Sequence, residues 1–287
     1  MNTLISQLPA SVTDNYMTKI GELKIFAKTI GTGVAVFIVE KTNASDTADL
    51  RIVGNGQFTN SSGSEDNGKT MSLPTNAIQN YIYVKATDPF YLYLGNKYIY
   101  TRFTISTNTP NTWKFDLGDM DFTYCNSLKT IEAYRVNETN VDLSELKNIN
   151  IENLRTSAPI GAFYGDIQHI CKPDYTKNID IRSNPDKPLY GNISAVSGCN
   201  KINTFVTINT ELEGNISAFG TAVSAVNITV ANSNVSGTLE SVFDSMYTNG
   251  RHSGSVTANA TGSLVTYNGS IPTENIVATF TNEGWTV

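Results

Sequence analysis

The sequence has few of the residues that most often carry chemistry, with three cysteines and two histidines among 287 residues. Cys125, Cys171 and Cys199 are odd in number and form no CxxC pair, which argues against a disulfide framework. We interpret them as packing residues. His169 and His252 lie far apart and outside any HExxH frame, so the sequence predicts neither a metal site nor a catalytic site built on them.

Charge and long apolar runs are also scarce. Only 16% of the residues are charged, and 20 basic against 26 acidic residues give a formal charge of −6. No cluster of Lys or Arg could follow a phosphate backbone, which argues against nucleic-acid binding. No stretch approaches the roughly 18 apolar residues of a membrane span, and residues 1–20 lack the basic start and apolar core of a secretory signal. We therefore expect a soluble protein made in a cytoplasm.

What the sequence does contain falls into two halves. From about Thr18 to Ser106, apolar and polar residues alternate in short runs that are rich in β-branched and aromatic residues, and Gly, Pro, Asn, Asp or Ser bounds each run. This alternation is typical of half-buried strands. We predict an N-terminal arm (1–16), an antiparallel β-sandwich of jelly-roll-like type (17–107) and a connector (108–120).

The second half, residues 121–287, repeats itself. LYGNISAV (189–196) and LEGNISAF (212–219) share six of eight letters at an offset of 23, and VSGTLESV (235–242) is a weaker copy at the same offset. Counting back from Leu212 and Val235 equates Phe205 with Ile228, and counting back from Val141 equates both with Tyr134. A small polar residue recurs in this frame at Thr139, Thr210 and Ser233, where we expect inward side chains to form a polar ladder.

This pattern, LxxLxLxxTxL followed by LxGxI, resembles the leucine-rich-repeat family over roughly residues 121–272. Thr or Ser at the ladder position departs from the family's usual Asn. The resemblance implies a degenerate solenoid whose coils bury their apolar sides against one another. Residues 274–287 are predicted to form a closing strand, with Trp285 covering the open end. The predicted fold class is thus mainly β, a β-sandwich followed by a leucine-rich-repeat solenoid.

Eight residues are candidates for a binding surface. Tyr81, Tyr83, Tyr91 and Tyr93 lie on the strand face opposite the apolar residues, where they could stack on sugars or a protein, or pack against a neighbouring element. Two insertions, 156–162 and 183–188, are predicted to project from one edge of the stack, and Tyr164, Tyr190, Asp186 and Lys187 lie within or beside them. Aromatic residues beside such loops are plausible recognition residues or simple edge covers.

Carboxylates are scattered, and no pair recurs at one aligned position. The sequence therefore favours a solvated face over a hydrolytic site, and we expect no catalytic residues and no cofactor.

Three phrases carry a second resemblance: MTKIGELKI (17–25), GNGQFTNSSGSEDNGKTMSLP (54–74) and FTNEGWTV (280–287). They are similar to stretches in virion proteins of crAss-like tailed phages of gut Bacteroidales. The resemblance implies a structural protein of the phage particle, a fibre-like or decorating appendage of head or tail. It also implies other virion proteins and a host-surface glycan or protein as partners, and a homo-oligomer, since virion parts are usually symmetric.

Two other functions remain open at this point. A bacterial leucine-rich-repeat adhesin would use the same repeat surface but needs an export signal. A virion-associated glycan hydrolase would need two carboxylates in a cleft.

Overall fold

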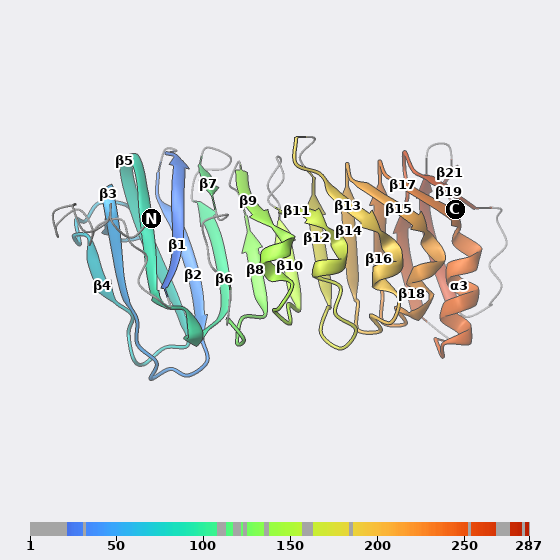
Figure 1. Ribbon diagram of the computed structural model, residues 1–287, viewed down its shortest axis with the longest axis horizontal. Coiled ribbons are helices and arrows are strands. Elements are labelled where there is room, and N and C mark those ends of the chain that lie inside the picture. Colours follow the sequence, from blue (N-terminus) through green and yellow to red (C-terminus); the bar gives the residue numbers. More distant parts are fainter. Residues whose placement is uncertain are drawn as a thin grey trace, which may run out of the picture.

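The computed structural model describes residues 22–30, 33–107, 113–116, 122, 125–134, 138–156, 163–183, 186–251, 254–267, 276–282 and 285–286. The protein is mainly β, with 50% of the chain in strands and 14% in helices, and its sheets are mixed and parallel. The expected mainly β class is therefore confirmed. Figure 1 shows an elongated molecule in which the strands follow one another along the long axis. The expected arm, residues 1–16, lies outside the described residues.

The N-terminal part, which we call the antiparallel region, contains these strands among its described residues: β1 (Glu22–Thr29), β2 (Ala35–Lys41), β3 (Asp49–Thr59), β4 (Thr70–Ser72), β5 (Gln79–Asn96), β6 (Tyr100–Thr107) and β7 (Lys114–Asp116). The short 3-10 helix η1 (Lys97–Ile99) joins β5 to β6. β5 is long enough to pair with two neighbours in succession, because its first half pairs with β2 and its second half with β1. The two runs that the sequence separates at 80–86 and 90–95 are therefore one strand.

Alternation along these strands places one set of side chains in the core. Every second residue of β2 is buried, among them Phe37 and Val39, and the same holds for Ile82 and Val84 of β5. Large aromatic residues fill this core. Trp113 stacks on the Phe115 ring at 5.8 Å, and Phe115 meets Phe37 edge-on at 5.5 Å.

Two strands join this region to the rest of the chain. β6 pairs antiparallel with β2 on one side and parallel with β8 (Thr130–Ala133) on the other. β7 likewise pairs antiparallel with β1 and parallel with β9 (Glu138–Asp142). Part of the expected connector, residues 114–116, is thus a strand, because Trp113 and Phe115 alternate into the core. One buried apolar cluster runs from Leu23 to Tyr267.

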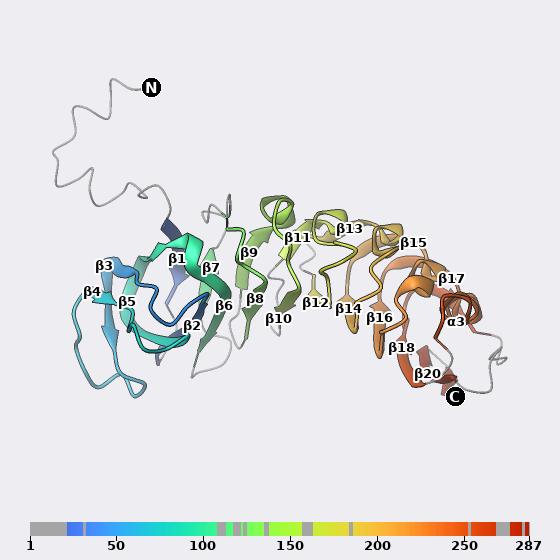
Figure 2. The same ribbon diagram turned by 90° about the horizontal axis from the view of Figure 1, so that it is seen from below.

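Beyond β6 and β7 the strands form two parallel ladders. The long ladder contains β8, β10 (Asn153–Thr156), β12 (Asn178–Arg182), β14 (Thr204–Ile208), β16 (Asn227–Ala231), β18 (Gly254–Asn259) and β20 (Ile276–Asn282). The short ladder contains β9, β11 (Phe163–Asp166), β13 (Leu189–Asn192), β15 (Glu211–Asn215), β17 (Asn234–Thr238) and β19 (Leu264–Thr266). Figure 2 shows the two ladders on opposite sides of the molecule.

The strand register confirms one part of the predicted frame and corrects another. Phe205 pairs with Ile228, 23 residues later, as the repeat predicts. In the first copy, however, the register leads from Phe205 through Ile179 and Leu154 to Ile131, not to Tyr134. Tyr134 is only half-buried. The prediction failed because it assumed a constant distance between the two strands of a coil.

The expected polar ladder is confirmed in part. Thr210 and Ser233 are both buried, and Ser233 Oγ donates to Val230 O at 2.7 Å. Thr210 Oγ1 has no hydrogen-bond partner among the described residues, and the side chain of Thr139 lies outside them. A second repeated polar residue is the Asn or Asp that ends β9, β11, β13 and β15. Asn192 Oδ1 accepts from Ser194 N at 2.9 Å, and Asn215 does the same for Ser217 N.

These residues start short helices that follow the short-ladder strands: η2 (Leu143–Leu146), η3 (Ile167–His169), η4 (Ile193–Val196) and η5 (Ile216–Thr221). After β17 the chain forms the α-helix α3 (Leu239–Thr248), which buries Leu239, Val242, Phe243 and Met246. β20 pairs parallel with β18, and β21 (Trp285–Thr286) folds back on it. The predicted terminal strand is therefore present; the Trp285 side chain lies outside the described residues.

Candidate functional site

One sheet surface that faces away from the core crosses both parts of the molecule, and most of its side chains are half-buried. The first half of β5, then β2, β6 and the long ladder pair in that order, and their buried residues point to the core. We call the opposite side the outer face. One row of register partners on it contains Tyr81, Ile38, Thr104, Glu132, Arg155, Asp180, Val206 and Thr229. The next row contains Gln79, Glu40, Arg102, Thr130, Asn153, Asn178, Thr204 and Asn227.

A charged cluster occupies the middle of the outer face. Glu132 is nearly buried, with 5% of its side chain exposed, and Arg102 Nε donates to its Oε2 at 3.1 Å. Arg102 also reaches Glu40, with Nη1 3.2 Å from Oε1. Thr104 Oγ1 donates to Glu132 Oε2 and Tyr134 OH donates to Oε1. Burial and the neighbouring Glu132 raise the pKa of Tyr134 to about 12, so this hydroxyl stays a donor at neutral pH.

Arginines continue the cluster across the next two strands. Arg155 lies between Glu132 and Asp180 in the register, and its Nε is buried without a hydrogen-bond partner among the described residues. Burial raises the pKa of Asp180 although Arg155 and Arg182 oppose the shift. Arg182 is exposed. This part of the outer face thus carries both signs of charge close together.

Amide and hydroxyl groups form the adjoining row of the outer face. Asn178 Nδ2 donates to Asn153 Oδ1 at 2.7 Å, and Asn153 Nδ2 donates to Thr130 Oγ1 at 3.0 Å. Each amide has two donors and two acceptor positions, so these bonds hold the side chains in place and leave further groups for a partner.

The predicted tyrosines on β5 fall into two sets. Tyr81 and Tyr83 lie on the outer face with ring centroids 6.4 Å apart and planes within 13°, and Tyr81 is 51% exposed. Tyr93 is 1% exposed because the Arg51 guanidinium covers its ring at 3.6 Å. Tyr91 stacks on Phe26 at 4.7 Å. The sequence cannot distinguish the exposed tyrosines from the covered ones, because the covering residues lie on other strands: Arg51 on β3 and Phe26 on β1.

The other candidates lie on the short-ladder side. Lys187 Nζ sits 4.8 Å from the Tyr164 ring centroid, and Tyr190 is 46% exposed. Tyr190 is in register with Asp166 and not with Tyr164, because neighbouring strands here are staggered by two residues. Asp186 is exposed. These four residues form a group separate from Tyr81 and Tyr83, and the middles of both insertions lie outside the described residues.

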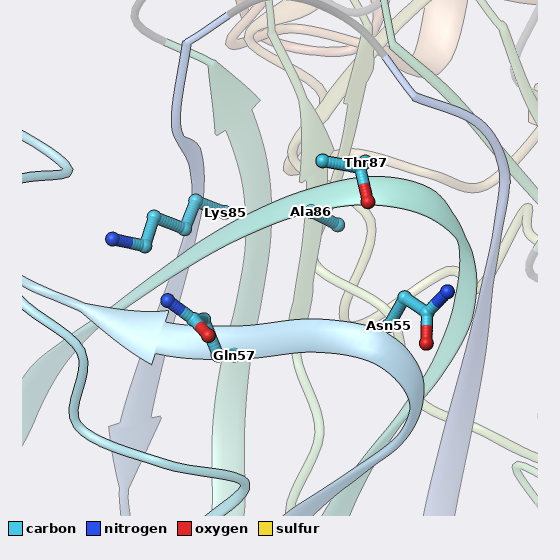
Figure 3. Close-up of a pocket in the computed structure, with 5 residues that line it drawn as sticks. All are labelled: Asn55, Gln57, Lys85, Ala86 and Thr87. Atoms are coloured by element: carbon cyan, nitrogen blue, oxygen red, sulfur yellow. The ribbon is translucent and has the colours of Figure 1, made fainter.

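Sequence reasoning missed a polar pocket where β3 and β5 diverge. Asn55, Gln57, Lys85, Ala86 and Thr87 line this cavity of about 280 Å³ (Figure 3). It opens at a β-bulge. Pairing passes from Gly56–Ala86 to Gly54–Phe90, so four residues of β5 span two of β3. A β-carbon on Gly56 would lie 2.9 Å from the Phe90 ring, which requires glycine at this crossing.

Hydrogen bonds fix the pocket's side chains. Asn55 Nδ2 and Thr87 Oγ1 donate to Asp88 Oδ2 at 2.9 and 3.0 Å, and these two bonds lower the pKa of Asp88. Lys85 Nζ donates to Gly63 O at 3.0 Å, which ties the pocket to the exposed loop between β3 and β4. With the Gln57 amide turned to match its neighbours, its oxygen accepts from Lys85 Nζ at 3.2 Å.

Other chemistry is sparse within the described ranges. No group of three or more His, Cys, Asp and Glu residues there could hold a metal ion, and His252 falls outside them. Cys125, Cys171 and Cys199 are buried free thiols, as expected of packing residues. No helix in the described part is long and apolar enough to span a membrane. The sequence matches no protein-family model, and a search of curated proteins finds no match.

Proposed function

We propose that this protein is a non-enzymatic structural component of a phage particle, a fibre-like or decorating appendage whose outer face contacts a host-surface protein or glycan. The observation that carries the proposal is the continuity of that face. It runs across eight register positions from Tyr81 to Thr229. An extended, rigid surface with aromatic, charged and amide groups suits recognition. The phage assignment itself rests on the sequence resemblance.

The finer fold assignment belongs to the same proposal. We infer a β-sandwich-like N-terminal domain joined to a leucine-rich-repeat-like solenoid. Support comes from parallel partners 23 residues apart at Phe205 and Ile228 and from the repeated Asn or Asp that begins each short helix. Each coil buries its apolar residues against its neighbours, which is the property that defines such stacks.

Mass spectrometry of gradient-purified phage particles tests the assignment. We expect peptides of this chain at a fixed copy number relative to the capsid protein, and the number distinguishes head decoration from tail. Absence from the particles would overturn the proposal and favour the bacterial adhesin.

Glycan hydrolysis is a second candidate, favoured by one pair of carboxylates. Glu132 and Asp180 lie two strands apart on the outer face, which at about 4.8 Å per strand is roughly 10 Å. Inverting glycoside hydrolases use two carboxylates about 6.5–9.5 Å apart, one with a raised pKa, and the pKa of Asp180 is raised by burial. Arg155 stands between the two residues, and four hydrogen bonds already engage Glu132, so hydrolysis ranks second.

Release of reducing sugar from purified capsule or cell-wall polysaccharide tests this second function. If the wild-type chain releases sugar and the Asp180→Asn variant does not, hydrolysis would replace a purely binding role as the proposed function. Its absence on all substrates that the chain binds would leave the binding proposal standing alone.

A further inference from the structure

The pocket between β3 and β5 opens on the same side of β5 as the exposed Tyr81 and the half-buried Tyr83. Lys85 is in register with Gln57, and Tyr83 is in register with Thr59. Tyr81, Tyr83 and Lys85 alternate with the buried Ile82 and Val84, so all three point outward. Same-face residues of a strand are about 6.6–6.8 Å apart. The two rings and the pocket therefore form one continuous strip.

The pocket offers hydrogen bonds in both directions. Of the three donors of an ammonium group, Lys85 uses two, to Gly63 and Gln57. The carboxylate of Asp88 uses Oδ2 for Asn55 and Thr87, and its other oxygen can accept. Among the described residues, the hydrogen bond of Asn55 uses only its Nδ2. A ligand must therefore donate and accept at closely spaced positions.

Charge restricts the ligand further. Two ammonium groups, Lys85 and Lys69, stand against two carboxylates, because Lys69 Nζ donates to Gly54 O at 2.5 Å, Asp88 lies beside Asn55 and Asp66 beside Gln57. A phosphate or sulfate would therefore meet no net positive charge, and an apolar ligand would cover the Asn55 and Gln57 amides without giving them hydrogen bonds. A neutral polyol satisfies the donors and acceptors without adding charge.

We propose that this pocket binds a neutral sugar unit of a glycan, and that Tyr83 and Tyr81 form the platform on which the next units lie. Sugar rings present a C–H face that packs against the electron-rich face of an aromatic ring, while their hydroxyl groups both donate and accept. This inference deepens the proposed function and rests on it, since it names the glycan as the ligand of one end of the outer face.

The test uses the full chain on an array of neutral oligosaccharides, followed by calorimetric titration of the best ligand. The expected result is saturable binding that Asn55→Ala and Tyr81→Ala each weaken about tenfold or more, the size typical of a central contact. Tyr81→Phe keeps the ring and should keep most of the affinity. Tyr175→Ala is the matched control, because Tyr175 is also exposed, at 42%, but lies outside the strip.

Two results would overturn the sugar site. One is failure of the wild-type chain to bind any neutral glycan. The other is unchanged affinity in both Asn55→Ala and Tyr81→Ala while circular dichroism shows that they are folded. Either outcome leaves the particle assignment intact if mass spectrometry detects the chain in particles, so failure of this inference and failure of the proposed function are distinguishable.

Discussion

The antiparallel region and the two ladders build one core in different ways. In the antiparallel region, bulky rings such as Trp113, Phe37 and Phe103 fill a core whose packing does not recur among the described residues. Along the ladders, a buried apolar residue returns at the same register position in each coil, as Leu154, Ile179, Phe205 and Ile228 do. A core that is not repeated needs side chains whose particular shapes fit together, whereas a repeating core needs the side chains of each coil to fit those of the neighbouring coil. The strand register of the antiparallel region therefore cannot be predicted from the sequence, whereas the register of the ladders follows from the repeat.

The largest expected effect tests whether the two regions are separable. Trp113→Ala removes a side chain that is 0% exposed and packs on Phe115 and Phe90, so we expect a loss of about 3–5 kcal/mol in the free energy of unfolding. Because strands and core continue across the junction, the whole chain should unfold in one transition. Circular dichroism during thermal unfolding measures this. Two separate transitions, of which only one shifts in the variant, would show independent regions.

A single methyl group should disturb the ladders almost as much. Gly214 has φ +105°, and a β-carbon there would lie 2.5 Å from Asn192 Oδ1 of the preceding coil. Gly214→Ala should therefore cost about 2–4 kcal/mol by denaturant titration, from backbone strain plus the clash. Gly250→Ala is the matched control, since Gly250 has φ +98° and nothing within 4 Å. Equal losses in the two variants would mean that the contact between coils adds nothing.

A smaller effect is expected where an ion triad links successive coils. Glu152 contacts Lys177 at 2.6 Å and Lys129 at 3.0 Å, and these lysines, Lys177 first, lower its pKa. The stabilisation is present above the unfolded-state pKa and is lost as pH falls through the folded-state pKa. Glu152→Gln should lower stability by about 1 kcal/mol at pH 7, and the difference should vanish in acid. A difference that persists there would point to lost packing.

The smallest effect has the opposite sign. Burial raises the pKa of Asp180, so the folded state holds its proton more tightly than the unfolded state. The contribution of Asp180 to the free energy of unfolding is therefore fully present at low pH and is lost as pH rises through the folded-state pKa. Asp180→Asn should stabilise the chain by less than about 1 kcal/mol at pH 7 and have no effect near pH 3. Asp174→Asn, at an exposed position, serves as the control; destabilisation by Asp180→Asn alone would indicate that Arg155 depends on the charge.

The sequence was informative where a residue's environment is set by its own repeat. LEGNISAF and LYGNISAV predict neighbouring coils because a stacked strand must present the same residues to the same partners. Alternation in β2 and β5 predicts their buried faces for a similar local reason. The helix α3 could have been found as well, since Leu239, Val242, Phe243 and Met246 follow helical spacing.

Other features depend on residues that are distant in the chain. The pocket exists because Gly56 packs under Phe90, 34 residues later. Lys41 is 1% exposed because its Nζ donates to three backbone carbonyls, those of Ala44, Asp46 and Pro74. Tyr81 and Tyr93 look alike in sequence, and only the position of Arg51 separates an exposed ring from a covered one. Such pairings have no local signal.

Binding of the full chain to whole Bacteroidales host cells, measured by flow cytometry, tests the outer face most directly. Thr204→Arg places a long side chain on that face between Asn178 and Asn227, whereas Ser194→Arg makes the same change of charge on η4, on the short-ladder side. We predict that Thr204→Arg abolishes cell binding and that Ser194→Arg leaves it unchanged. Undiminished binding by a folded Thr204→Arg variant would contradict the assignment of the outer face as the contact surface.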